Sequence, residues 1–149
     1  MKKPSTVSPT GVTTILSVSP IEEDHRSLQT FSGQSAWKFL KADSIRASFA
    51  FLKRHEVSVV ICERDLPPDK TWIDMLENMI HLPHPPSLIV TSRLADDHLW
   101  AEALNLGAWD VLAKPFDRIE VLRSLRSAWQ HWTDRVHEHS VTREMKAAS

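Results

Sequence analysis

Several features that mark particular classes of protein are missing from this 149-residue sequence. It has a single cysteine, so a disulfide framework is excluded, and Cys62 lies in the apolar run 57–62, where a buried small hydrophobic residue is expected rather than a nucleophile. No stretch approaches the roughly 20 apolar residues of a membrane span, and no apolar segment follows the N-terminal lysines as in a signal peptide. We therefore expect a cytoplasmic protein that does not bind membranes.

An excess of charge of one sign is also lacking. The formal net charge is −1 and no basic run interrupts the mixture, so no nucleic-acid partner is expected. Only three glycines occur, with no Gly-rich phosphate loop after the first apolar run and no Gly-x-Ser-x-Gly elbow. These absences argue against nucleotide binding, hydrolase chemistry and a flavodoxin-type cofactor site.

The sequence does contain short apolar runs rich in β-branched residues, which alternate with longer amphipathic segments. This alternation predicts βαβ units and an α/β fold, with a doubly wound, five-stranded parallel sheet and five helices. The expected strands and helices are residues 13–18, 36–40, 57–62, 87–91 and 111–113, and residues 20–31, 44–54, 71–80, 96–106 and 118–136. We expect a disordered leader over residues 1–12, one domain over 13–136 and a polar, partly disordered tail over 137–149.

Three of the predicted boundaries have specific local signals. In Ser19-Pro20-Ile21-Glu22, a Ser N-cap, a Pro at the first helical position and a Glu at the third predict a capping box. Gly107 suits a left-handed C-terminal cap, and the prolines of residues 82–86 end the preceding helix.

Functional side chains of an open parallel sheet gather beyond the carboxyl ends of its strands, which here are residues 19–20, 63–65, 91–92 and 114–115. In order and spacing, four segments resemble the signature of the response-regulator receiver domain: Cys62-Glu-Arg-Asp-Leu-Pro67, Val90-Thr-Ser92, Gly107-Ala108 and Lys114-Pro-Phe116. The resemblance covers roughly residues 13–132. It implies a flavodoxin-like receiver topology and a role in two-component, phosphorelay-type signalling.

Several positions of the implied phosphorylation site are altered. Counting back from Pro67 places Glu63 where the family has its phospho-accepting aspartate. Ser19 and Pro20 stand where the family has the acidic pair that holds Mg²⁺. We therefore expect no metal site and no cofactor, with Mg²⁺ binding weak or absent.

Other positions of the site are kept. Thr91 matches the hydroxyl residue that contacts the phosphoryl group, and Lys114 matches the lysine of the site. Val111 occupies the position of the aromatic switch residue, so the usual rotamer-coupled switch is not expected.

Phosphoryl transfer to a carboxylate needs divalent charge to offset the repulsion between anions. Without the acidic pair, transfer is expected to fail. Glu63 is one methylene longer than aspartate and is predicted to reach ion-pair distance from Lys114. Two interpretations stay open: Glu63 mimics the phosphorylated state, or the pair is only structural.

Three other candidate sites are weaker. Asp65 is an alternative phospho-acceptor, although two residues past the strand end it is misplaced for in-line attack. The acidic residues 22–24 could form a replacement metal cluster, but capping and the helix dipole already account for acids in a first helical turn. The histidines at 81, 84, 131, 137 and 139 lack partner ligands at metal-site spacing and are expected on the surface.

Candidate partner surfaces involve four apolar residues. Trp132 and Val136 continue a helical seam past the length that the sheet should cover, which suggests a dimer contact. Trp100 and Trp109 flank the predicted helix 96–106 and strand 111–113, on the face that receivers use for partners. The alternative for all of them is ordinary core packing.

The leading hypothesis is a stand-alone, atypical receiver, or pseudo-receiver, that acts by protein contact and is not an enzyme. Its expected partner is a histidine kinase, a downstream output protein or a second copy of the chain. The alternative is an active phosphorelay receiver that accepts phosphate on Asp65 or Glu63 from a histidine kinase. A third hypothesis is the regulatory part of a larger assembly, with the tail after His137 as a linker.

Overall fold

Strands and helices alternate in the computed structural model, which describes residues 13–31 and 37–148. The predicted leader, residues 1–12, lies outside the described residues. In chain order the elements are β1 (Thr13–Val18), α1 (Glu22–Phe31), β2 (Trp37–Ala42), α2 (Ile45–Leu52), β3 (Val59–Glu63), β4 (Asp65–Leu66), β5 (Lys70–Thr71), α3 (Trp72–Met79), β6 (Ser87–Ser92), α4 (Asp97–Leu106), β7 (Asp110–Ala113) and α5 (Arg118–Ala148).

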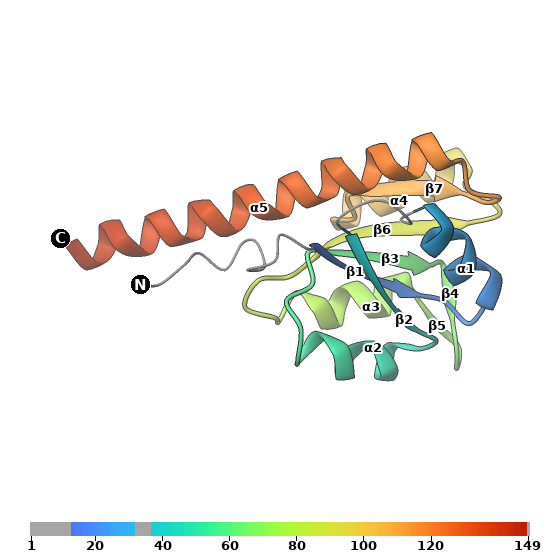
Figure 1. The fold of residues 1–149 in the computed structure, drawn as a ribbon, viewed down its shortest axis with the longest axis horizontal. Coiled ribbons are helices and arrows are strands. Elements are labelled where there is room, and N and C mark those ends of the chain that lie inside the picture. The colour runs from blue at the N-terminus through green and yellow to red at the C-terminus, as the bar shows by residue number, and fades with distance from the viewer. Residues whose placement is uncertain (1–12, 32–36, 149) are drawn as a thin grey trace.

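The main sheet has five parallel strands in the order β2-β1-β3-β6-β7. From β1 the chain moves outward to β2 and then returns to β3 on the other side of β1. Helices cover both faces, with α2 and α3 on one side of the sheet and α5 on the other (Figure 1). The predicted doubly wound sheet is confirmed, and its strand order reverses between β1 and β3, where such folds place their sites.

The core forms two layers because successive residues of a strand point to opposite faces. Leu16, Val60 and Val90 pack with residues of α3 and α4 in one cluster. Ile15 and Ile61 pack with residues of α1 and α5 in the other. The central strands β3 and β6 are buried at every position, as expected for a parallel sheet covered on both faces.

A small antiparallel hairpin, which the sequence did not predict, follows the central strand β3. Its strands, β4 and β5, pair Asp65 with Thr71 and Leu66 with Lys70. Leu66 is buried, and Asp69 in the turn has a positive φ of 54°. Two residues per strand are too few to show the alternation of apolar and polar residues that predicts a strand. The prolines and charged residues between them do not indicate a strand either.

The helix ends agree with the predictions in part. Gly107 caps α4 with a left-handed φ of 113°, as predicted. The predicted capping box at the start of α1 is wrong. The Ser19 N–H donates to the Ala42 carbonyl and not to Glu22, whose carboxylate bonds to Lys41 instead. Only the Ser19 hydroxyl acts as expected, accepting from the Ile21 N–H at 3.0 Å.

The last helix is longer than predicted. α5 continues from Arg118 to Ala148 and extends past the sheet in Figure 1, so residues 137–148 of the tail that was expected to be partly disordered are helical. The segment contains no Gly or Pro and is rich in helix formers such as Glu, Lys, Met and Ala. Helix propensity therefore outweighs polarity here. None of the described helices, α5 included, combines the length and the apolar character needed to cross a membrane.

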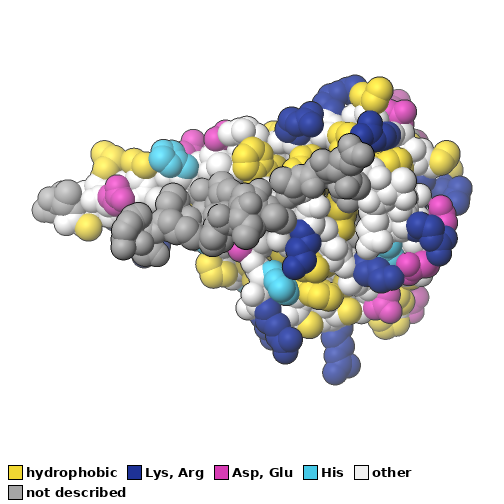
Figure 2. Space-filling view, viewed as in Figure 1, with side chains coloured by type: hydrophobic (Ala, Val, Ile, Leu, Met, Phe, Trp, Pro, Cys, Tyr) yellow, Lys and Arg dark blue, Asp and Glu magenta, His cyan; other side chains and the backbone are white. Residues whose placement is uncertain are grey.

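Surface charge is mixed on the face drawn in Figure 2. Lys and Arg side chains lie among acidic and apolar ones there, without a large field of one sign. This agrees with the formal net charge of −1.

Candidate functional site

The carboxyl ends of four strands bring the predicted site residues together. Glu63 is the last residue of β3 and is in register with Thr91 of β6. Lys114 follows β7, the neighbour of β6, and Ser19 follows β1, the neighbour of β3. The predicted convergence at one edge of the sheet is confirmed.

Glu63 and Lys114 form the predicted ion pair. The Lys114 Nζ lies 2.5 Å from Glu63 Oε1, and the two side chains are 5% and 11% exposed. The second carboxylate oxygen of Glu63 accepts a long hydrogen bond of 3.5 Å from the Asp65 N–H. The pair is therefore largely removed from water, unlike the exposed ion pairs of α1.

A second carboxylate, from Asp24 of α1, completes this arrangement. Its Oδ2 lies 2.8 Å from Lys114 Nζ and accepts a 2.7 Å hydrogen bond from the Ser19 hydroxyl. One ammonium group therefore contacts two buried carboxylates, and the three side chains carry a net charge of −1. We call Asp24, Glu63 and Lys114 the site triad.

Sequence reasoning did not assign Asp24 to the site, because the three consecutive acids of residues 22–24 look alike in the sequence. Glu22 and Glu23 are exposed and pair with Lys41 and Arg26, as acids of a first helical turn often do. Asp24 instead lies four residues before the buried Leu28, on the inward face of α1. The four-residue spacing between Asp24 and Leu28 was the sequence signal that could have assigned Asp24 to the site.

His25 is a second residue that the sequence analysis missed. It is 4% exposed, and its Nε2 donates to the Ser19 carbonyl at 2.8 Å while Nδ1 lies 2.8 Å from the Ser17 hydroxyl. A carbonyl oxygen only accepts, so Nε2 carries the proton of its bond. His25 thus ties the first turn of α1 to the end of β1 and helps to hold Asp24 toward Lys114.

The positions of the implied acidic pair have other uses here. Ser19 is 3% exposed and bonds to Asp24 and to the Ile21 N–H, while Pro20 is exposed. A hydroxyl and a proline replace two carboxylates. Among residues 13–31 and 37–148, no group of three or more His, Cys, Asp or Glu side chains is arranged to hold a metal ion.

The remaining positions of the predicted site are buried. Thr91 is 2% exposed beside Glu63, and Val111 is 2% exposed in the core cluster that also contains Leu99 of α4. Burial, together with the charge of Glu63, raises the pKa of the Cys62 thiol far above its ordinary value. Cys62 is therefore a protonated core residue, as predicted, and not a nucleophile.

The candidates at the edges of the site lie elsewhere. Asp65 is exposed on β4, in the hairpin that follows the site. The predicted dimer contact through Trp132 and Val136 is corrected, because both are buried within the chain, at 1% and 3% exposure. They pack where α5 passes the loop of residues 82–86, and the Trp132 indole N–H donates to the His84 carbonyl at 3.4 Å. The sheet is therefore not the only surface that α5 covers.

The other two tryptophans differ from each other. Trp100 is 38% exposed on α4. Trp109 stacks on His131 at 4.3 Å between ring centroids and donates to Ser127 at 2.9 Å, so much of its surface is used within the chain. The expectation of surface histidines is confirmed for His81, His137 and His139, whereas His84 and His131 are half-buried.

Comparison with known proteins gives a consistent result. Residues 22–126 match the family model of the response regulator receiver domain. No curated protein matches the sequence. The signal receiver domain of an HD domain-containing protein from Pseudomonas fluorescens is similar at 25% identity, with a TM-score of 0.75 over 87% of this chain and 95% of that one.

Two more distant solved structures share the fold. A CheY-like response regulator receiver domain protein from Methanospirillum hungatei is 17% identical, with a TM-score of 0.72 over 83% of this chain and 98% of that one. A chemotaxis response regulator from Vibrio cholerae is 15% identical, with a TM-score of 0.70 over 78% and 98% of the two chains.

Proposed function

The chain belongs to the response regulator receiver domain family, and we propose that it is an atypical receiver that signals by protein contact without metal-dependent phosphorylation. Receiver domains of two-component response regulators are signalling domains that interact with protein partners. The proposal concerns how this member differs. One observation carries it: the Lys114 ammonium group lies between the carboxylates of Asp24 and Glu63.

The donor set supports the absence of a metal-dependent step. Mg²⁺ binds through carboxylates and waters in a near-ideal octahedral shell. Here Ser19 and Pro20 supply no carboxylate, and both Asp24 and Glu63 already contact the Lys114 ammonium, whose positive charge repels a divalent cation in the same place. The residues present do not fit the metal that the family implies.

The same arrangement disfavours phosphoryl transfer to Glu63. In such a transfer, a carboxylate oxygen forms a bond to phosphorus while the bond from phosphorus to the leaving acetate of acetyl phosphate breaks. Glu63 would have to attack while its Oε1 is bonded to Lys114, with Asp24 adding a second negative charge beside the approaching anion. Without a divalent cation, only the single charge of Lys114, already shared by two carboxylates, opposes that repulsion.

A site with this charge distribution has one stable state. The Glu63 carboxylate already contacts Lys114 in the absence of phosphate, so no phosphorylation event is needed to form that contact. We therefore propose that Glu63 gives the domain a fixed signalling state. Val111, which is buried in place of an aromatic switch residue, is in keeping with a domain that does not alternate between states.

The α4 side of the molecule is the surface that we assign to the protein partner. Trp100 and Leu104 lie four residues apart on α4, at 38% and 47% exposure, and so share a face of the helix. Leu94, which precedes α4, and Leu106 at its end are also exposed, at 69% and 49%. Apolar side chains of this size suit a histidine kinase, an output protein or a second copy of the chain.

The test is incubation with acetyl phosphate, with and without Mg²⁺, followed by intact-mass measurement. The parent is expected to gain no phosphoryl group. A Ser19→Asp/Pro20→Asp/Glu63→Asp variant restores the carboxylates and is expected to gain one only with Mg²⁺. The matched control, Ser19→Asp/Pro20→Asp with Glu63 kept, separates metal binding from the acceptor.

A parent chain that gains a phosphoryl group with Mg²⁺ would contradict the proposal. Glu63→Gln and Asp65→Asn variants would then identify the acceptor, and the protein would be an active phosphorelay receiver.

A further inference from the structure

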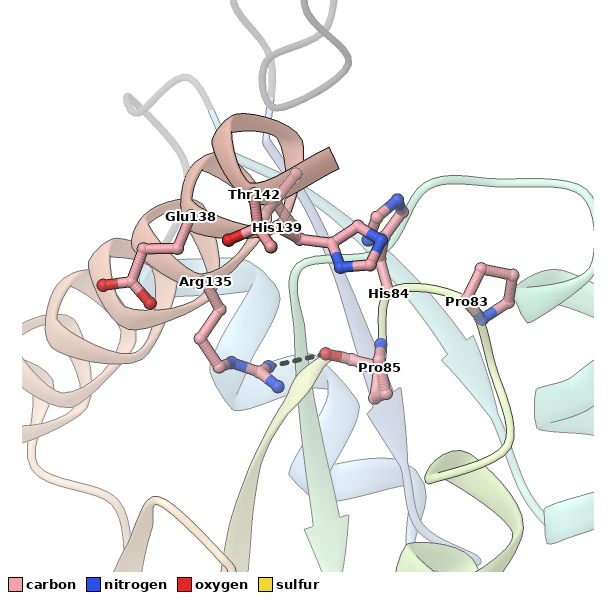
Figure 3. Close-up of a pocket in the computed structure, with 8 residues that line it drawn as sticks. Pro83, His84, Pro85, Arg135, Glu138, His139 and Thr142 are labelled. Atoms are coloured by element: carbon pink, nitrogen blue, oxygen red, sulfur yellow. Dashed lines mark hydrogen bonds between the residues drawn. The ribbon is translucent and has the colours of Figure 1, made fainter. Parts of the chain in front are cut away.

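A hollow of about 400 Å³ lies at the opposite end of the sheet from the site triad. It opens between α5 and the loop of residues 82–86, which we call the proline loop and which leads into the amino end of β6 (Figure 3). Its volume is in the range of small-molecule sites, roughly 300–1,000 Å³. The polar side chains that line it are His84, Arg135, Glu138, His139 and Thr142.

Arg135 carries a half-buried positive charge on one side of this hollow. Its Nη2 donates to the Pro85 carbonyl at 2.7 Å, and its Nε is buried without a hydrogen-bond partner. Burial lowers the pKa of Arg135, as expected for a cation removed from water. The guanidinium group has therefore lost hydration that the Pro85 carbonyl only partly replaces.

No acidic side chain among residues 13–31 and 37–148 forms an ion pair with Arg135. None of the ion pairs among the described residues includes it. Residues 1–12 and 32–36 contain no Asp or Glu, so the described part of the chain holds every acidic side chain. Glu138 lines the hollow, but Figure 3 shows its carboxylate pointing away from the two histidines.

Further donors face the same space. The rings of His84 and His139 meet edge to face at 5.6 Å between centroids, and both point into the hollow in Figure 3. Burial lowers the pKa of His84, and His139, Arg143 and Arg135 add to this effect by repulsion. The hollow thus brings one guanidinium group and two imidazole rings together around a single space.

We propose that this hollow binds a multiply charged phosphate-type anion, with Arg135 as its cation and the rings of His84 and His139 as further hydrogen-bond donors. Guanidinium groups bind phosphate oxygens through strong, charge-assisted hydrogen bonds. A bound dianion supplies the counter-charge that the Arg135 guanidinium group lacks, and the Thr142 hydroxyl at the rim adds a neutral donor. This inference does not depend on the site triad, which lies beyond the carboxyl ends of the strands.

The test is calorimetric titration of the full chain with inorganic pyrophosphate at pH 6 and low ionic strength, with acetate as the monoanion control. We expect saturable binding of one pyrophosphate and no saturable binding of acetate. Arg135→Gln is expected to weaken the affinity about tenfold or more, which corresponds to the loss of one charge-assisted contact. Arg123→Gln, on the exposed side of the same helix, is the matched control and should bind as the parent does.

Two further variants keep the test decisive if Arg135→Gln folds poorly. A His84→Gln/His139→Gln variant is expected to bind pyrophosphate more weakly than the parent at pH 6. Its affinity should not increase when the pH is lowered from 8 to 6. Glu138→Gln is expected to bind equally or more tightly. The charged and titratable groups of α5 that face His84 are Arg135, Glu138, His139 and Arg143. On the other side of the proline loop, His55 and Glu56 face it across a second hollow.

The source of the phosphate group is distinguished by a parallel titration with ADP. Equal affinities for ADP and pyrophosphate indicate an inorganic anion, and tighter ADP binding indicates a phosphate carried by an organic molecule. Absence of saturable pyrophosphate binding, or an equal loss in Arg123→Gln and Arg135→Gln, would overturn the proposal. Weaker binding in Glu138→Gln would also overturn it, because a carboxylate should not assist an anion.

Discussion

Lys114 and Arg135 are cations at opposite ends of one sheet, and their charges are compensated to different extents. Lys114 has two carboxylate partners, from Asp24 and Glu63, at 2.8 and 2.5 Å. Arg135 has one backbone carbonyl and a buried Nε without a partner. Removing a charge from water is costly unless a counter-charge replaces the lost hydration. At the carboxyl end the counter-charge comes from within the chain, whereas at the amino end it is missing.

This difference separates two kinds of chemistry. A cation already neutralised by carboxylates has little remaining affinity for a phosphoryl group, which is the basis of the proposed fixed state. An unneutralised cation beside a hollow gains most from an external anion. At the ordinary binding end of a doubly wound sheet the cation is thus already paired with carboxylates, while at the opposite end it is not.

The largest effect is expected from Lys114→Met. Removal of the ammonium leaves Asp24 and Glu63 as two buried carboxylates without a counter-charge, and breaking such an interaction from one side costs about 3–5 kcal/mol of the free energy of unfolding. Urea denaturation at pH 7 measures this loss. Lys41→Met, in an exposed pair with Glu22, is the control and should change stability little. A similar small change in both variants would mean that the triad is not stabilising.

Ser19→Ala should have the next largest effect. The hydroxyl donates to Asp24 and accepts from the Ile21 N–H, so its loss leaves a buried carboxylate oxygen and the start of α1 each without one partner. We expect destabilisation by about 1–2 kcal/mol. Ser27→Ala, which removes an exposed hydroxyl from the same helix, is the control. Equal stability of the two variants would argue against a positioning role for Ser19.

Arg135→Met should change stability far less than Lys114→Met. The apolar part of the side chain is retained, and the charge that disappears is one that the fold does not compensate. The expected change in the free energy of unfolding is within about 1 kcal/mol in either direction in a buffer without multivalent anions. A loss as large as that of Lys114→Met would show that Arg135 has an internal partner and would remove the contrast between the two ends.

The smallest expected effect is on the pH dependence of the free energy of unfolding. Burial lowers the pKa values of His84 and His131, so the folded protein prefers their neutral forms. Their contribution to stability is fully present above the ordinary histidine pKa of about 6.5 and is lost as the pH falls through the lowered values. His131 is stacked on Trp109 from the β7 side and lies near Asp134, Arg135 and Glu138 of α5.

Denaturation between pH 8 and pH 5 should therefore give a shallower stability loss for His84→Gln than for the parent. The comparison is made as a difference, because carboxylates add their own pH dependence to both proteins. An identical slope would indicate that the His84 environment is the same in the folded and unfolded states.

Some features of the fold could be read from particular residues. The central strands β3 and β6 appear as the apolar runs 57–62 and 87–91 because a strand covered on both faces excludes water at every position. Gly107 predicted the end of α4 because few other residues adopt a positive φ without strain. The Glu63–Lys114 pair was predictable because the carboxyl ends of neighbouring strands must lie at one edge of the sheet.

Other features required the three-dimensional arrangement. Three consecutive acids at the start of α1 look equivalent in sequence, and only the rotation of the helix against the sheet selects Asp24 for the site. The tail after His137 looks disordered by polarity, yet it continues a helix that is held to the proline loop through Trp132 and Arg135. Burial of Trp132 likewise depends on a loop 48 positions away in the chain.

The sequence by itself determined the sheet, its order of elements and the expected pair between Glu63 and Lys114, and it predicts that Glu63 occupies the phospho-acceptor position. These follow from local hydrophobic patterns and from the rule that parallel strands end together. Only the tertiary structure decided which charges meet. Asp24 reaches Lys114 across 90 positions of the chain, and Arg135 reaches a carbonyl but no carboxylate. The reason is physical, because the energy of a buried charge depends on distances that sequence spacing does not determine.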